Sequence, residues 1–173
     1  MDITPLKQKF YHSCLVTSLM MISKMNDQSI EERIFMEGEK RRHNYYLRGI
    51  IDSFVDNTML SVEIIVDNKY FAEEVAKPKS KNIKVINEKI TLELIKKLLE
   101  TQAFIIDLDD NFLGDYSHAS HFVVIEKVLP NGKFQIIDPS SGGKKMLTAE
   151  KLENSISSLK NHIKMCPLII RKI

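Results

Sequence analysis

Cys14 is one of two cysteines in the chain, and it directly follows Ser13 at the start of an apolar run that extends to Met25. The run, CLVTSLMMISKM, is apolar on nearly all sides, which predicts a buried helix with Ser13 as its N-cap. Free N–H groups and the positive end of the dipole at a helix start stabilise a thiolate, the nucleophilic form of cysteine. Because most cysteines are simply small core residues, Cys14 needs partners before it predicts a nucleophile.

His121 and Asp138 are the candidate partners of this thiol. His121 begins the run HFVVIEKV and Asp138 ends the run KFQIID, and a turn sequence separates the two runs. The pattern predicts a β-hairpin. With a four-residue turn at 129–132, Asp138 pairs with Val123, so His121 lies diagonally across from it on the same face. A bulge or a three-residue turn would move this register by one residue.

A carboxylate beside an imidazole holds one tautomer and stabilises the protonated ring, which is what a base next to a thiol needs. Gln8, six residues before Cys14, supplies a further polar group in the segment that leads into the predicted helix. Its amide and the backbone N–H of Cys14 could both face a developing negative charge on a carbonyl oxygen. An exposed surface glutamine is the alternative.

These features follow one another in the order of a known family. They are Gln8, Cys14 at the start of a buried helix, His121 directly before FVVI, and Asp138 followed by Pro139 and the nearby Gly142. The chain resembles the papain-like cysteine peptidases of the bacteriocin-processing, double-glycine type. The resemblance covers most of the chain, from about residue 5 to the final predicted strand.

The resemblance implies roles for four residues. Cys14 is then the nucleophile, His121 the general base and later general acid, Asp138 the residue that orients the ring, and Gln8 the oxyanion donor. It also implies hydrolysis of a peptide or amide bond in a peptide or protein substrate, with a leader peptide cut after a double-glycine-type site. No cofactor and no metal is expected.

Two positions depart from the family pattern. The family usually has glycine after the cysteine and often an acid before it, and here they are Leu15 and Ser13. These departures bear on the shape of the substrate cleft that the resemblance implies, so the reaction class carries over more directly than the double-glycine specificity. Two alternatives stay open: a peptide-binding module that does not hydrolyse, and an acyltransferase that uses the same Cys-His-Asp site.

The predicted elements give an α+β fold, with a helical N-terminal half that carries Cys14 packed on an antiparallel sheet that carries His121 and Asp138. Predicted helices cover 14–25, 29–38 with a Ser29/Glu32 capping box, 44–57, 68–76, 91–100 and 148–159. Predicted strands cover 60–66, 83–86, 103–108, 121–129, 133–137 and 163–173.

Length and composition support one soluble domain, residues 1–173. The net charge is only +2, which gives no support for a nucleic-acid partner. The N-terminal sequence does not fit a secretory signal, and no apolar stretch is long enough to cross a bilayer. With two cysteines outside any CxxC pair, a cytoplasmic location without a disulfide framework is expected.

Four other features are interpreted without a functional site. His118 is a rival of His121 as the base, and their spacing on a strand disfavours a shared metal. The basic run at 40–43 with Tyr45 and Tyr46 beside it is expected to be a solvated surface, because four acids precede it. The segment 140–145 is expected to be a surface turn, and Cys166 to be a packing residue.

Overall fold

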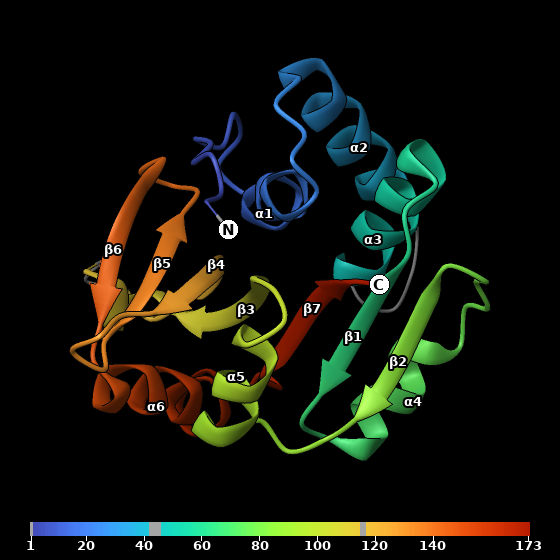
Figure 1. Ribbon diagram of the computed structural model, residues 1–173. Coiled ribbons are helices and arrows are strands. Elements are labelled where there is room, and N and C mark those ends of the chain that lie inside the picture. Colours follow the sequence, from blue (N-terminus) through green and yellow to red (C-terminus); the bar gives the residue numbers. More distant parts are fainter. Residues whose placement is uncertain (1, 42–45, 115–116) are drawn as a thin grey trace.

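A computed structural model describes residues 2–41, 46–114 and 117–173 of the chain, and these form an α+β domain (Figure 1). The helices are α1 (Cys14–Ile22), α2 (Gln28–Lys40), α3 (Tyr46–Thr58), α4 (Lys69–Ala76), α5 (Leu92–Leu99) and α6 (Ala149–Ser158). The strands are β1 (Val62–Val66), β2 (Ile83–Asn87), β3 (Phe104–Asp109), β4 (Ser120–Val128), β5 (Phe134–Asp138), β6 (Gly143–Leu147) and β7 (Leu168–Lys172). None of the helices in these ranges is long and apolar enough to span a membrane.

The seven strands form one mixed sheet in the order β2-β1-β7-β3-β4-β5-β6. All neighbouring strands are antiparallel except β1 and β2, which run parallel. The prediction of an antiparallel sheet is therefore wrong at this edge. Helix α4 connects the two strands and returns the chain to the end where β1 began, so β2 must run in the same direction.

Helices cover both faces of the sheet (Figure 1). One apolar cluster joins α1 and α3 to the face formed by Ile105, Phe122 and Val124. A second cluster joins α5 and α6 to the opposite face, which carries Ile106 and Val123. The alternation of these neighbours along β3 and β4 follows from the two-residue period of a strand.

Helix α1 is the most deeply buried helix among those described, as its all-round apolar sequence predicts. Every residue from Leu15 to Met21 is at most 1% exposed. The hydroxyl of Ser18 donates to the carbonyl of Phe122 (3.2 Å), which fixes α1 on β4 one residue away from His121. The helix ends at Ile22, three residues earlier than predicted, because Lys24 takes a left-handed backbone conformation (φ 58°).

Most other predicted elements are confirmed with ends shifted by one or two residues. Thr91 and Thr148 accept N-cap hydrogen bonds as expected. The Ser29/Glu32 capping box is wrong: Asp27 caps α2 by accepting from the backbone N–H of Ser29. Asparagine or aspartate is as good an N-cap as serine, so the earlier acid takes the position.

The C-terminal part of the chain differs more from the predicted elements. Residues 159–163 form a π-helical turn, and the final strand begins only at Leu168. The basic run at 40–43 and the predicted helix start at 44 lie partly outside the described residues.

Strand β6 was not predicted, since its residues were assigned in part to a surface turn. Its sequence GKKML carries two lysines, and it lies at the edge of the sheet, paired only with β5. Charged edge strands are common because lysine discourages pairing with another chain. The turn itself is confined to residues 139–142, where Gly142 has a positive φ of 67°.

Candidate active site

Cys14 is the first residue of α1, but Ser13 does not cap the helix with its side chain. The Ser13 hydroxyl instead lies 2.8 Å from a carboxylate oxygen of Glu31, and the Thr17 hydroxyl donates to the same oxygen (3.0 Å). The prediction of a serine cap is therefore wrong in its contact. The Ser13 side chain therefore takes none of the first-turn N–H groups, and the positive end of the helix dipole lies next to the thiol.

Glu31 was not foreseen as part of the site. It is 1% exposed, and it also accepts from the backbone N–H of Lys9 (2.9 Å). One carboxylate from α2 thus holds both the loop before Cys14 and the start of α1. A single glutamate in an amphipathic helix gives no sign in the sequence that its partners lie 14 to 22 residues away.

His121 and Asp138 meet as the hairpin argument predicts, with 2.9 Å between Nε2 and Oδ1. The turn is shorter than expected, because Leu129 pairs with Lys133. A bulge between Ile125 and Lys127 moves the register back by one residue. The two deviations cancel, so His121 and Asp138 are diagonal neighbours after all.

The charges of this pair are strongly coupled. Burial by itself lowers the pKa of His121, but the hydrogen bonds to Asp138 and Cys14 raise it to about 10. Burial by itself raises the pKa of Asp138, but the contacts with His121 and Lys145 hold it well below its ordinary range. The ground state is therefore an imidazolium beside a carboxylate.

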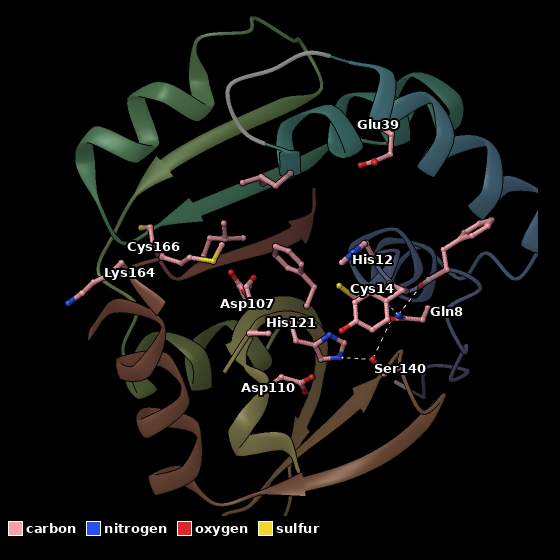
Figure 2. Close-up of a pocket in the computed structure, with 18 of the residues that line it drawn as sticks. Gln8, His12, Cys14, Glu39, Asp107, Asp110, His121, Ser140, Lys164 and Cys166 are labelled. Atoms are coloured by element: carbon pink, nitrogen blue, oxygen red, sulfur yellow. Dashed lines mark hydrogen bonds between the residues drawn. The ribbon is translucent and has the colours of Figure 1, made fainter. Parts of the chain in front are cut away.

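Asp138 is held from several sides. Its second oxygen, Oδ2, pairs with Lys145 Nζ (2.7 Å), and its first accepts from the backbone N–H of Ser140 (2.8 Å). The Ser140 hydroxyl lies 3.3 Å from His121 Nε2. Since Nε2 is occupied by these groups, Nδ1 is the ring nitrogen left for the thiol. Figure 2 shows Cys14 and His121 next to each other on the cleft wall.

Gln8 reaches the site, but its amide is engaged. The backbone N–H of Gln8 donates to the carbonyl of Pro139 (2.8 Å), which ties the loop to the end of β5. Its side-chain Nε2 donates to the carbonyls of Phe10 (2.9 Å) and Tyr11 (2.8 Å). Gln8 therefore braces its own loop in this state, and it must release one of these carbonyls to donate to an oxyanion.

A cleft of about 1230 Å³ opens in front of these groups. Cys14, His121 and Gln8 line it, while Asp138 lies behind the imidazole. Apolar side chains from several elements form much of the wall: Leu47, Phe71, Phe122, Met165 and Leu168. Three acids also line it: Glu39, Asp107 and Asp110. The lining therefore offers both apolar and charged contacts to a ligand.

His118, the rival of His121, lies elsewhere. Its Nδ1 pairs with Asp109 (2.7 Å), and its ring packs against that of His162 at 4.0 Å between centroids. It is absent from the described lining of the cleft. Within the described ranges, no group of three or more His, Cys, Asp or Glu side chains could hold a metal ion.

Cys166 packs against the cluster around α1 and also borders the cleft. Burial raises the pKa of its thiol to about 11, and the nearby Asp67 adds to the rise. Cys166 is therefore a poor nucleophile at neutral pH.

No protein-family model matches the chain, and no curated protein sequence matches it. What the chain does must therefore be inferred from the geometry around Cys14 and from the chemistry of its neighbours.

Alkylation rates should separate the two cysteines. We expect iodoacetamide to modify Cys14 at least roughly tenfold faster than Cys166 at pH 7, because Cys14 hydrogen-bonds to the His121 imidazole, whereas burial raises the pKa of the Cys166 thiol. Peptide mapping of the folded protein measures both rates. His121→Ala should remove the difference and His118→Ala should leave it; equal rates in the unmodified chain contradict an activated Cys14.

The His121–Asp138 pair should also make stability depend on pH. The pKa of His121 is raised in the folded chain, so its contribution is complete below about pH 6.5 and is lost progressively towards pH 10. The pKa of Asp138 is lowered, so its contribution is complete above about pH 3.9 and is lost on acidification. We therefore expect Asp138→Asn to lower the free energy of unfolding most between about pH 4 and 6.5.

Urea unfolding of the wild-type protein and Asp138→Asn across pH 4 to 9 measures this difference. A difference that stays constant from pH 6 to 9 contradicts the charged pair.

Proposed function

We propose that the chain is a papain-like cysteine hydrolase that cuts a peptide or amide bond through a thioester on Cys14. The observation that carries this proposal is the buried His121–Asp138 pair beside a cysteine at the start of the central helix, with Cys14 and His121 on the wall of one cleft. Nucleophile, base and orienting carboxylate are the three parts that covalent hydrolysis requires. The cleft gives a substrate access to the thiol.

The reaction follows from these positions. The Cys14 thiolate attacks the carbonyl carbon, a C–S bond forms, and the carbonyl electrons move onto oxygen. His121 gives its Nδ1 proton to the leaving nitrogen as the C–N bond breaks, which releases the first product. His121 then accepts a proton from water, the resulting hydroxide attacks the thioester, and the C–S bond breaks to restore the thiolate and imidazolium pair.

The oxyanion of each tetrahedral intermediate forms near the start of α1. The backbone N–H of Cys14 is one donor, and the helix dipole stabilises negative charge at the same place. Gln8 supplies the second donor once it leaves the carbonyl of Phe10 or Tyr11. Asp138 keeps the ring oriented and charged throughout, with Lys145 holding its other oxygen.

The arrangement of elements supports the papain-like part of the proposal. A buried helix carries the cysteine, and the hairpin β4–β5 presents the histidine and aspartate from a sheet beneath it. The leader-peptide substrate with a double-glycine-type site has support only from the residues that resemble that family. The reaction class is therefore the firmer half of this proposal.

Hydrolysis should depend on Cys14 and on His121, but not on His118, which lies three residues earlier in the chain. We expect the wild-type protein to cleave members of a mixed peptide library, and Cys14→Ala and His121→Ala to cleave none, because each removes a bond-making or proton-carrying group. Mass spectrometry identifies the products. His118→Ala is the matched control and should retain cleavage, because its ring pairs with Asp109 and not with the thiol.

The products also distinguish the alternatives. Free carboxyl ends indicate transfer to water, whereas adducts with added amines or thiols indicate an acyltransferase. Saturable peptide binding without cleavage, together with equal alkylation of Cys14 and Cys166, overturns the enzyme and favours a binding module.

Gln8 should affect the chemical step more than binding. We expect Gln8→Ala to lower kcat by about 10²-fold with a smaller change in KM, because an oxyanion donor acts mainly in the transition state. Steady-state kinetics on a cleaved library peptide measure both. Urea unfolding serves as the control for the lost brace on Phe10 and Tyr11. A change in kcat below threefold contradicts the oxyanion role.

A further inference from the structure

Asp107 lies on β3 at the point where one face of the sheet stops packing in the core and begins to line the cleft. Two residues before it, Ile105 belongs to the cluster under α1. Asp107 itself pairs directly with Phe122 on β4. On its other side, the register of β7 places Leu168 opposite it, since Ile105 pairs with Ile170. Asp107, Phe122 and Leu168 form a row across three strands, and all three line the cleft.

The carboxyl group of Asp107 is only half satisfied. The side chain is 1% exposed, and its Oδ1 accepts from the Ser120 hydroxyl (2.7 Å). Its Oδ2 is buried and has no hydrogen-bond partner among the described residues. Burying a polar oxygen without a partner is unfavourable, so an unpartnered oxygen on a cleft wall points to a partner that enters from outside.

The charge of Asp107 has no direct ion-pair partner among the described residues, although His121 next to it in the sheet lowers its pKa. Burial raises its pKa to about 7, against the opposing effects of Ser120 and His121. A cation that entered the cleft would pair with the ionised form and remove much of the cost of its burial.

We propose that Asp107, with Phe122 and Leu168 beside it, forms a subsite for the basic side chain of a peptide substrate. The apolar row contacts the methylene groups of a lysine or arginine, and Oδ2 of Asp107 accepts from the charged end. Because Oδ1 already holds Ser120, the contact uses one oxygen. The aliphatic stem and charged end of a basic residue match these two kinds of surface.

The subsite lies close to the bond that would be cut. The two residues that contact Asp107 from β4 flank His121 in the chain: Ser120 precedes His121 and Phe122 follows it. Figure 2 shows Asp107 between the part of the cleft that carries His121 and the part that carries Cys166. The basic residue therefore lies within a few positions of the scissile bond. This inference rests on the proposed function for its meaning as a substrate subsite.

Two other acids line the cleft and serve as comparisons. Glu39 is exposed near the end of α2, and Asp110 lies in the short helical turn after β3. Neither combines burial with a free carboxylate oxygen in the described structure. If the cleft attracted basic peptides through its overall charge alone, removing Asp110 would matter as much as removing Asp107.

The test measures peptide binding to Cys14→Ala, which separates recognition from cleavage. A set of fluorescein-labelled alanine-based octapeptides carries lysine, acetyl-lysine or norleucine at each position in turn. We expect at least one position where lysine binds tenfold or more tightly than norleucine and acetyl-lysine. Adding Asp107→Asn should reduce this preference below threefold, while adding Asp110→Asn should keep it above fivefold.

Asparagine has nearly the same shape and its oxygen can still accept from Ser120, so Asp107→Asn should fold; circular dichroism checks this. The acetyl-lysine peptides test the charge without altering the protein. Absence of any lysine preference, its persistence in Asp107→Asn, or its loss in Asp110→Asn alone overturns the subsite.

The outcomes also separate this inference from the proposed function. Cleavage of library peptides without a lysine preference removes only the subsite. If the protein cleaves no peptide but shows a lysine preference that depends on Asp107, only the proposed hydrolase function is contradicted.

Discussion

The contact between Asp138 and His121 is the interaction on which the rest of the site depends. The Asp138 carboxylate on β5 binds His121 on β4, Lys145 on β6 and the backbone N–H of Ser140. The carbonyl of the next residue, Pro139, accepts from the backbone N–H of Gln8. A buried carboxylate is stable only when such partners surround it. The hairpin β4–β5 and the edge strand β6 are therefore fixed relative to one another through this one side chain, and the N-terminal loop is attached next to it through Pro139.

A second buried carboxylate, Glu31, positions Cys14 much as Asp138 positions His121. It holds the loop before Cys14 and the first turn of α1 from a neighbouring helix. The thiol is thus positioned by the helical half of the domain and the imidazole by the sheet. Their alignment requires the packing of α1 on β4, which the Ser18 hydroxyl fixes beside His121.

Much of the site could be predicted from the sequence because its signals are local. The apolar run after Cys14 identified the buried helix, and the two strand patterns brought His121 and Asp138 together, although only because a shorter turn and a bulge cancelled. Glu31 and Asp107 could not be found in this way. Each is one acid in an ordinary element, and its meaning comes from partners far away in the chain. Strand β6 was missed since an edge strand with lysines lacks the apolar alternation of an inner one.

The wide separation of Cys14 from its partners has a consequence during synthesis on the ribosome. Asp138 emerges 124 residues after Cys14, which at typical elongation rates takes roughly 6 to 25 s. His121 emerges 107 residues after Cys14, so for most of this interval the cysteine lacks its imidazole neighbour, and it lacks the Asp138 carboxylate until the interval ends. The surroundings of the Cys14 thiol are therefore complete only after β5 has been made and has folded against α1, so the side chain lacks these neighbours for most of the synthesis of this segment.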